Sequence, residues 1–478
     1  MLPSDFEIYT SSLFGDSRWQ QYLTAFNEAP PVSIRLNPFK TFEPARTSER
    51  LNSLELARSA FEPSFSSLEL TRCVPWSRHA FYLAERPNFT LDPLFHAGAY
   101  YVQEASSMFL DHVLTSLVPS SARLSTYGAQ EPAKRLEPFE PFELAHEVSD
   151  LNQREARLNR SEGALLILDL CAAPGGKSTL LRAALPDDAM LFSNEPDRRR
   201  AHILMENMQK QGHPNVIVTN NYPRDYRKAG MLFDMILADV PCSGEGMFRK
   251  DPKTISEWSV DNVIKCQQLQ RSIIHDIWPC LKPGGILIYS TCTFNTRENE
   301  ENIQWIIDHF QAQVINIPVN PEWHITGSLL PSFSHPVYRF IPGITQGEGL
   351  FMAVLQNPLE PFEQAKRLEP ARSAFEPAKR LNCLHNGTSI QSTIKGKKVI
   401  PNHAESLSIA TPKDKYPRVE LSKDEALRYL RHEALILPPD TPRGYVIVTY
   451  AHLPLGFVNN IGTRANNLYP KEWKIRNL

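Results

Sequence analysis

The sequence predicts an α/β protein whose central sheet is parallel and doubly wound. Two observations support this class. First, the runs ALLILDL (164–170), AMLFSNE (189–195), NVIVTNN (215–221), FDMILADV (233–240) and GGILIYST (284–291) have the length and composition of buried strands. Second, helix-like segments lie between them, including an amphipathic run over 198–212 that ends at Gly212. Strands that alternate with helices build βαβ units, and these bind ligands at the carboxyl ends of the strands.

Length and composition exclude several other classes. The chain has 478 residues, of which 42% are hydrophobic and 22% are charged, so we expect several packed domains rather than a disordered or fibrous chain. The formal net charge of −2 provides no global attraction to nucleic acid, so such binding would need local patches. Seven cysteines without a Cys-x-x-Cys pair indicate neither a disulfide framework nor a zinc site. With no signal peptide and no long apolar run, we expect a cytoplasmic protein without metal or membrane anchor.

Proline is unusually abundant, with 39 residues against 21 glycines. The excess is concentrated in three segments, 42–72, 131–145 and 358–382, which share the phrases ARSAFEP and AKRLEP. These copies are too far apart and too irregular for a solenoid, which needs contiguous repeats. Proline interrupts helices and the charges recur closely, so we interpret the segments as exposed low-complexity insertions. A partner-binding role is the alternative.

A glycine-rich turn follows the first predicted strand, in LDLCAAPGGKST (168–179). Small residues let the backbone approach a ligand, and the following helix offers free N–H groups to a phosphate or to a cofactor carboxylate. The end of this run resembles a phosphate loop, but that motif requires glycine where the chain has Cys171. Glu195 ends the second strand and is placed to accept hydrogen bonds from ribose hydroxyls.

Two further strands each deliver a cysteine to the same edge of the predicted sheet. Asp239 and Cys242 follow the run 233–240, and Cys292 follows the run 284–291. A lone cysteine is usually a buried structural thiol, but two at the ligand edge favour chemistry. Asp239 could instead bind magnesium in a nucleotide hydrolase. After Cys292, we expect Asn295 or Thr296 to cap a helix and to pair with Glu298.

Together these motifs resemble the RNA cytosine-C5 methyltransferases of the RsmB/RsmF (Nop/Sun) type. The resemblance is carried by CAAPGGKST, SNE, DVPCSGEGMFRKD and STCTFNTRENEENI, in that order, and extends to residues 91–110 and 338–355. The N-terminal LPSDF and the segment GYVIVTYAHLPLGFV resemble the F-type 16S rRNA branch. The resemblance implies a Rossmann-like methyltransferase core that uses S-adenosyl-L-methionine, with an N-terminal α+β domain and a C-terminal PUA-like RNA-binding domain.

The resemblance also implies roles for individual residues. Cys292 would attack C6 of cytosine, because C5 is too weak a nucleophile until a thiolate has added to the ring. Asp239 would contact N3 and the amino group of the base, Cys242 would assist release of the C5 proton, and Lys177 would lie near the active site. The residues implied in cofactor binding are Cys171, Ala172, Ala173, Pro174, Gly175, Gly176, Lys177, Glu195 and Asp239.

One position departs from the family pattern. Where the family usually has an acid near the adenine, this chain has Tyr222, and Asp225 follows three residues later. Asp225 could replace the acid, Tyr222 could stack on adenine, or cofactor binding could be weaker. This departure keeps open a catalytically inactive RNA-binding or ribosome-assembly factor on the same fold. A P-loop-like nucleotide hydrolase is the other alternative, which Cys171 disfavours.

The expected partner is small-subunit rRNA or an assembling ribosomal subunit, bound by a monomer. Arg249 and Lys250 could face phosphate. Arg198, Arg199 and Arg200 could do so as well, but for these three we favour a solvated start of a helix. In the last residues Tyr469 and Trp473 lie among basic side chains, which suits phosphate contacts and base stacking, although a solvated domain face would look the same. The expected domains are 1–96, 97–356 and 383–478, with insertions at 42–72, about 126–160 and 357–382.

Overall fold

The computed structural model describes residues 2–40, 68–117, 164–359, 375–388, 390, 392–395 and 398–476. The expected insertion at about 126–160 lies outside the described residues, as do residues 42–67 of the first insertion and residues 360–374 of the third. The end of the first expected insertion, however, forms strand β2 (Leu70–Cys73), and Leu70 is buried. In the third, residues 375–382 contain helix α13 (Phe375–Ala378) and the buried Leu381. Both insertions therefore end in packed structure rather than in exposed loops.

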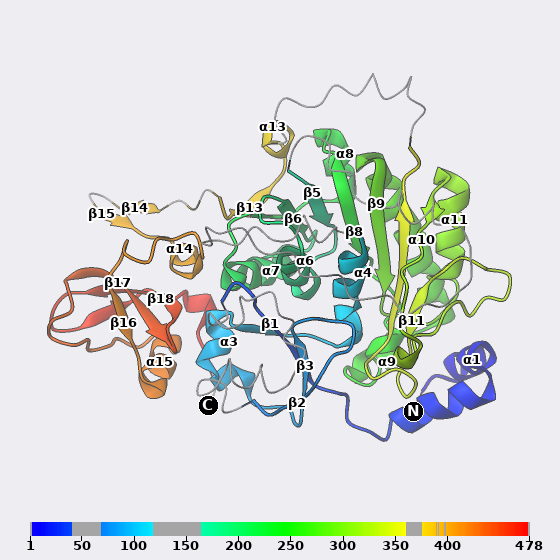
Figure 1. Cartoon of the computed structure of the whole chain (residues 1–478), viewed down its shortest axis with the longest axis horizontal. Helices are drawn as coiled ribbons and strands as arrows, with labels where there is room; N and C mark the ends of the chain where they lie inside the picture. Colours follow the sequence, from blue (N-terminus) through cyan, green and yellow to red (C-terminus); the bar gives the residue numbers. More distant parts are fainter. Residues whose placement is uncertain are drawn as a thin grey trace, which may run out of the picture.

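The central domain contains a nine-stranded sheet within the described residues, and its parallel core confirms the predicted fold class (Figure 1). The strand order is β10-β12-β9-β8-β5-β6-β7-β13, and β11 pairs with β12. The parallel strands are β5 (Leu166–Asp169), β6 (Met190–Asn194), β7 (Val216–Thr219), β8 (Phe233–Asp239) and β9 (Leu281–Thr291). The antiparallel strands are β10 (Gln313–Val314), β11 (Tyr338–Phe340), β12 (Leu350–Gln356) and β13 (Cys383–Asn386).

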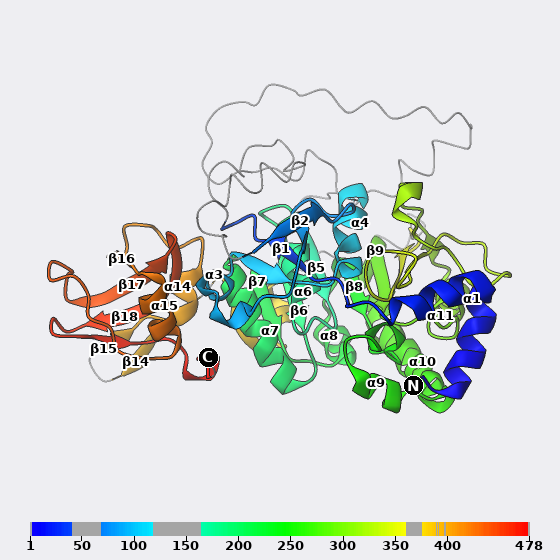
Figure 2. The ribbon, with the colours of Figure 1, turned by 90° about the horizontal axis from the view of Figure 1, so that it is seen from below.

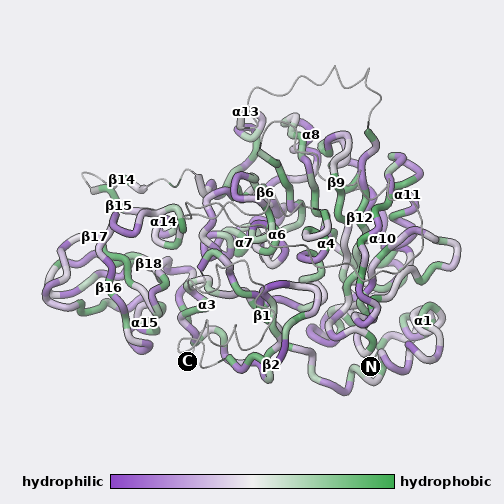
Figure 3. Tube along the Cα trace, viewed as in Figure 1, coloured by the Kyte–Doolittle hydropathy of each residue, from purple (hydrophilic) through white to green (hydrophobic). Residues whose placement is uncertain are grey.

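Helices cover both faces of this sheet and create two separate apolar cores. Successive strand residues point to opposite faces, so Ile167 packs in one core and Leu168 in the other. The first core is covered by α4 (Phe109–Leu117), α6 (Gly176–Ala184) and α7 (Arg198–Gln211). The second is covered by α8 (Pro223–Ala229), α10 (Val260–Ile277) and α11 (Glu300–Phe310). Burial on both faces explains why apolar residues are consecutive within these strands, as in residues 235–238 of β8. In Figure 3, hydrophobic stretches in green alternate with white and purple stretches in the central domain.

The N-terminal region contributes a long helix and a small antiparallel sheet. Helix α1 spans Ser4–Ala25, and the sheet has the order β2-β3-β1-β4. Its other strands are β1 (Ser33–Leu36), β3 (Ala80–Leu83) and β4 (Tyr100–Val102), and short helices follow at η2 (Phe89–Leu91), α3 (Pro93–Ala97) and η3 (Ser106–Met108). Aromatic side chains of α1 pack with Phe248, Trp258 and Phe294 of the central domain. Helix α1 and the C-terminal domain lie at opposite ends of the molecule (Figure 2).

The C-terminal domain is a four-stranded sheet with helices beside it. Its strands are β16 (Arg418–Glu420), β17 (Gly444–Tyr450), β18 (Leu453–Asn460) and β19 (Ala465–Asn467), which pair in that order. The other elements are the hairpin of β14 (Thr393–Lys395) and β15 (Lys398–Ile400), the helices α14 (His403–Leu407) and α15 (Lys423–Leu430), and η8 (Lys471–Trp473). The remaining elements, all in the central domain, are η5 (Glu245–Met247), α9 (Pro252–Glu257), η6 (Trp278–Cys280) and η7 (Pro321–Trp323).

Tyr469 belongs to the core of the C-terminal domain, so the expectation that it stacks on RNA bases is wrong. Its side chain is 2% exposed and packs against Tyr429 and His403. Trp473 also packs on the edge of His403, with Lys210 of α7 over its ring. Trp473 therefore connects the C-terminal domain to α7 of the central domain. Among the described residues, no helix combines the length and the apolar character needed to cross a membrane.

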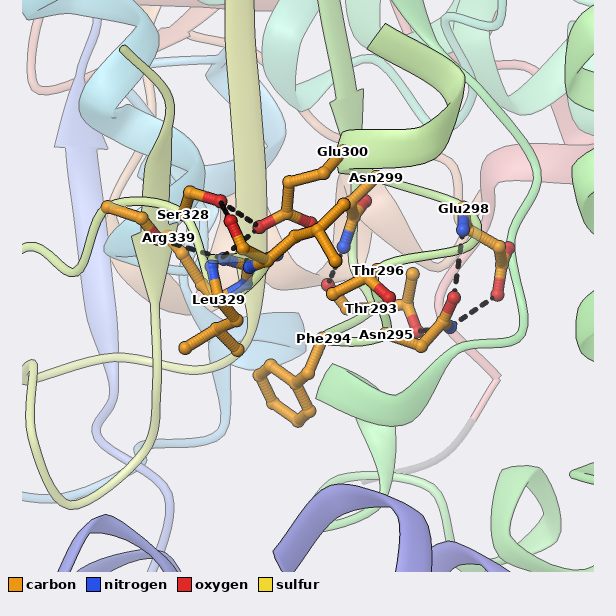
Figure 4. Close-up of polar contacts among 12 residues, drawn as sticks. Thr293, Phe294, Asn295, Thr296, Glu298, Asn299, Glu300, Ser328, Leu329 and Arg339 are labelled. Carbon is orange, nitrogen blue, oxygen red and sulfur yellow. Dashed lines mark hydrogen bonds and ion pairs between the residues drawn. The ribbon is translucent and has the colours of Figure 1, made fainter. Parts of the chain in front are cut away.

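We expect one buried ion pair to be a strong determinant of stability. Arg339 of β11 donates to Glu300 at the start of α11 over 2.8 Å, and neither side chain is exposed (Figure 4). Replacing one partner leaves the other charge buried and unpaired, so Arg339→Met should lower the free energy of unfolding by about 3–5 kcal/mol. Urea unfolding curves measure this loss. The exposed pair Arg428–Glu433 is the control, and Arg428→Met should change stability by less than about 1 kcal/mol. Equal effects of the two variants would contradict the prediction.

Candidate active site

The two predicted cysteines meet at the carboxyl edge of the sheet. Cys242 follows β8 and Cys292 follows β9, and these strands are parallel neighbours in which Asp239 lies opposite Ser290. The two sulfur atoms are 3.1 Å apart, and the backbone N–H of Cys292 points to the sulfur of Cys242 at 3.3 Å. Burial and the hydrogen bond between the thiols raise the pKa of Cys242 well above its ordinary value, with the hydrogen bond as the larger cause.

Lys177 and Asp239 form an ion pair beside the thiols. The ammonium group of Lys177, on the first turn of α6, donates to Asp239 Oδ2 over 2.8 Å, and the hydroxyl of Ser290 donates to Oδ1 over 2.6 Å. Burial alone would lower the pKa of Lys177, but the Asp239 carboxylate and the nearby sulfur of Cys292 outweigh it and raise the pKa. The site therefore holds a buried lysine whose charge is paired with the Asp239 carboxylate.

The glycine-rich turn forms the second part of the site. Residues 170–175 connect β5 to α6, and Gly175 has a φ of 118°, which favours glycine at this position. Asp169 ends β5, and its Oδ2 accepts the hydroxyl of Ser178 over 2.6 Å. Its Oδ1 is buried and has no hydrogen-bond partner among the described residues, and burial raises the pKa of this carboxyl to about 7. An unpaired carboxylate oxygen beside a glycine turn is suited to a ligand donor group.

Glu195 lies at the end of β6, on the same edge as the turn. It accepts the backbone N–H of Asp197 over 3.0 Å, and Arg200 lies 3.3 Å from its other oxygen. The side chain is 2% exposed, and burial raises its pKa despite these partners. Cys171, at the start of the turn, is half-buried, and desolvation raises the pKa of its thiol. The structure therefore places all the predicted cofactor-binding residues along one edge.

Two buried glutamates, which we call the glutamate pair, connect the two cysteine loops. Glu298, from the Cys292 loop, accepts the backbone N–H of Ser243 in the Cys242 loop over 3.0 Å. Reciprocally, Glu245 from the Cys242 loop accepts the backbone N–H groups of Phe294 and Asn295 over 2.6 and 3.0 Å. The sequence analysis missed this role of both residues, because only the tertiary fold shows which backbone groups they reach.

Asn295 lies between the two members of the glutamate pair. Its side-chain amide donates to Glu245 over 3.1 Å. The same amide donates to Glu298 over 2.8 Å, and the side-chain oxygen accepts the backbone N–H of Glu298 (Figure 4). The expected pairing with Glu298 is therefore present, but it forms a turn before the helix. Helix α11 begins at Glu300 with Asn299 as its N-cap, so neither Asn295 nor Thr296 caps it as expected.

Several residues around the site differ from the sequence expectations or have other partners. Arg249 has a side chain that is 6% exposed and donates to the carbonyl of Glu28 over 3.3 Å, so the expectation that it faces phosphate is wrong. Lys250 is exposed, as are the three arginines 198–200. Tyr222 is 57% exposed, with the guanidinium of Arg224 over its ring. Asp225 accepts the backbone N–H of Tyr222 over 2.9 Å at the start of α8.

The central sheet is doubly wound and has a parallel core. It carries a glycine turn, an acid at the end of the second strand, and polar side chains where the strand order switches. This combination defines the class of Rossmann-like methyltransferases. Solved structures agree: a methyltransferase homolog from Pyrococcus horikoshii is 23% identical and superimposes with a TM-score of 0.51, covering 74% of this chain and 100% of that chain. At this level of sequence identity, the structural comparison supports the fold alone.

Three family models match this chain, and each of them describes part of an RsmB/RsmF methyltransferase. A model described as 16S rRNA methyltransferase RsmB/F matches residues 156–356, the RsmF PUA domain matches 416–475, and the N-terminal domain of RsmF matches 41–105. The ribosomal RNA small subunit methyltransferase F of Escherichia coli O9:H4 (strain HS) is 26% identical over an alignment of 508 positions. The alignment covers 94% of this chain and 95% of that protein. Its counterpart in Salmonella heidelberg (strain SL476) is 27% identical over 511 residues, with the same coverage.

The environment of Glu298 predicts a measurable pH dependence of stability. Burial, and then the neighbouring Glu245, raise the pKa of Glu298 from 4.5 to about 7. An acid whose pKa is higher in the folded state stabilises the fold while protonated, so this contribution disappears as the pH rises through about 7. Glu298→Gln cannot ionise, and its melting temperature should fall less than that of the wild type between pH 5 and 8.

Thermal unfolding in a series of buffers measures this difference in slope. Glu425→Gln is the control, because Glu425 lies on the exposed start of α15 and hydrogen bonds from Ser422 lower its pKa. That variant should retain the wild-type slope above pH 5. Parallel curves for Glu298→Gln and the wild type would show that Glu298 does not titrate in this range.

Proposed function

We propose that this protein transfers a methyl group from S-adenosyl-L-methionine to C5 of a cytosine in small-subunit ribosomal RNA. The observation that carries the proposal is the pair of thiols 3.1 Å apart, placed beside the Lys177–Asp239 ion pair at the ligand edge of a methyltransferase sheet. A single thiol would suffice for addition to a ring, whereas two adjacent thiols suit addition followed by release. The family models and the names of the relatives support RNA of the small subunit as the substrate.

The residues along the edge of the sheet fit this cofactor. The unpaired Oδ1 of Asp169 suits an ammonium group, the N-terminus of α6 suits a carboxylate, and Glu195 suits the two hydroxyls of a ribose. An amino acid joined to a nucleoside offers all three groups. The bound cofactor would supply the electrophilic methyl group. The remaining steps follow from the side chains of the chain itself.

Cys292 is the nucleophile in this proposal. Its thiolate adds to C6 of the base, and the electrons of the C5–C6 double bond make C5 nucleophilic enough to take the methyl group. Lys177 lies at the same edge of the sheet, in its ion pair with Asp239. Asp239 lies between Lys177 and Ser290, where it would contact the N3 and amino edge of the cytosine.

Cys242 serves the release step. After methyl transfer the C5 proton leaves with the assistance of Cys242, the C5–C6 double bond forms again, and the C6–S bond breaks with its electrons returning to Cys292. Cys292 therefore acts in the addition step and Cys242 acts in the release step. The glutamate pair fixes the distance between their loops, so one approach of the base serves both steps.

The RNA must present an unstacked cytosine to reach these thiols, which costs a few kcal/mol. Lys250 is exposed on the central domain, and we expect it to contact a phosphate. The PUA domain at 416–475 and the N-terminal domain supply further contacts. We expect the protein to act as a monomer in the cytoplasm, where ribosomal subunits assemble.

An inactive RNA-binding factor on the same fold is the second candidate, and one observation favours it. Tyr222 occupies the position of the usual adenine-binding acid, and Asp225 is engaged with the backbone of Tyr222. A protein of this kind would bind the same RNA without transferring methyl groups. The retained thiol pair and the Lys177–Asp239 ion pair favour the enzyme.

Methyl transfer to RNA tests the proposal directly. We expect the wild type to transfer labelled methyl groups from S-adenosyl-L-methionine to small-subunit rRNA or to assembled subunits. Cys292→Ala should abolish transfer, because it removes the nucleophile. Cys242→Ala should accumulate a covalent protein–RNA adduct on a denaturing gel, because release is blocked.

Cys73→Ala is the matched control, since Cys73 lies in strand β2 of the N-terminal domain. It should transfer methyl groups at the wild-type rate without a persistent adduct. Transfer by Cys292→Ala would exclude the assigned nucleophile. A folded wild type that binds RNA but transfers nothing would favour the inactive factor.

A further inference from the structure

The segment that leads to the C-terminal domain joins the central sheet next to the proposed cofactor site. We call residues 381–387 the linker strand, because they contain β13 and precede the C-terminal domain. β13 pairs antiparallel with the edge strand β7, so that Cys383 lies opposite Thr219 and Asn386 lies opposite Ile217. Thr219 is the last residue of β7. The N-terminal end of the linker strand therefore lies at the carboxyl edge of the sheet.

At that edge the backbone of Asn382 binds the two residues that follow β7. Its N–H donates to the side-chain oxygen of Asn221 over 3.0 Å, and its carbonyl accepts the side-chain amide of Asn221 over 3.1 Å. The same carbonyl accepts the backbone N–H of Asn220 over 3.0 Å. The side chain of Asn221 thus makes a two-point contact with the backbone of one residue of the linker strand.

Asn221 connects this contact to the neighbouring strand ends. Its backbone N–H donates to the side-chain oxygen of Asn194 over 3.0 Å, and its carbonyl accepts the Asn194 amide over 2.9 Å. Asn194 ends β6, and its amide also donates to the carbonyl of Leu170, just after β5, over 3.0 Å. A continuous series of amide contacts therefore runs from the linker strand across the ends of β7, β6 and β5.

The same series reaches Glu195, the residue proposed to bind the ribose. The side-chain amide of Asn220 donates to the carbonyls of Glu195 and Pro196 over 2.8 and 2.9 Å. The backbone N–H of Glu195 donates to the carbonyl of Thr219 over 3.1 Å. The backbone on both sides of the Glu195 side chain is thus held by residues that the linker strand holds in turn.

Both ends of the linker strand are fixed to the central domain. Leu381, next to Asn382, is 7% exposed and packs in the apolar core on the α8 and α10 side of the sheet. At the other end, Gly387 donates its N–H to the carbonyl of Val216 over 2.9 Å. An added Cβ at Gly387 would lie 2.3 Å from the carbonyl oxygen of Pro214, so only glycine allows this close approach.

We propose that the linker strand, when docked on β7, holds the cofactor site in its binding conformation. In this proposal Asn221 is a positioning residue that couples the docking of the strand to the position of Glu195. The inference rests on the proposed function, since it assigns regulation to that cofactor site. Binding is reciprocal: if the docked linker strand favours the cofactor, the cofactor favours the docked linker strand by the same factor. Because the strand continues into the C-terminal domain, an event at that domain that displaces it would weaken cofactor binding.

Calorimetric titration of the full chain with S-adenosylhomocysteine tests whether the docked linker strand supports cofactor binding. Asn221→Ala removes the two side-chain hydrogen bonds to Asn382 and keeps the backbone contacts with Asn194. We expect its dissociation constant to rise about 5- to 20-fold, the effect of losing two hydrogen bonds. Leu381→Ala loosens the strand from a residue remote from Glu195 and should act in the same direction. At saturating cofactor, the turnover of both variants should stay within about twofold of the wild type.

The matched control is Asn386→Ala, an asparagine at the far end of the same strand. Its side chain accepts hydrogen bonds only from Thr388 among its contacts in the described residues. We expect its dissociation constant to stay within about twofold of the wild type. Melting temperatures of the unliganded variants show whether each is folded at the temperature of the titration.

Amide hydrogen exchange gives a second readout that does not depend on activity. S-adenosylhomocysteine should slow exchange in residues 381–387 of the wild type, and less so in Asn221→Ala. Wild-type affinity in both Asn221→Ala and Leu381→Ala, or no change in exchange when the wild type binds, would overturn the inference alone. A wild type that does not bind S-adenosylhomocysteine would overturn the proposed function as well.

Discussion

The parallel pairing of β8 with β9 is the constraint on which the candidate site depends. Because the two strands run in the same direction and in register, Cys242 and Cys292 leave the sheet at one edge although 50 residues separate them. Pairing alone would leave two loops free to move apart. The glutamate pair removes that freedom, since each acid binds the backbone of the opposite loop. Buried acids with several donors hold backbone more firmly than apolar contacts, which lack direction.

Elements outside the sheet also hold the two cysteine loops in place. Helix α1 covers the cysteine loops with aromatic side chains, and the hydroxyl of its Tyr9 lies 3.2 Å from that of Thr296. The buried Arg339–Glu300 pair fixes the start of α11 directly after the Cys292 loop. The linker strand closes the opposite side, beyond β7. The site thus depends on segments from the beginning, the middle and the last quarter of the chain.

The fold class and the thiol pair could be predicted because their signals are local. Strand runs, the glycine turn and cysteines at strand ends each need only a few adjacent residues. The glutamate pair could not be predicted, since Glu245 and Glu298 look like surface acids until the loops are brought together. Burial was equally hidden: Tyr469 and Arg249 have the composition of RNA contacts, yet tertiary packing encloses both. The domain limits and the roles assigned to individual site residues stay predictions.

The position of the linker strand also determines when the sheet can be completed. A chain folds as it is synthesised, from its N-terminus onward. Strands β5 to β9 can pair once about residue 291 has left the ribosome, but β7 then has an open edge. An open edge offers unpaired N–H and carbonyl groups to strands of other chains. That edge is covered only after Cys383–Asn386 emerge, nearly a hundred residues later. During synthesis, the nascent protein therefore has an interval in which it is most exposed to aggregation.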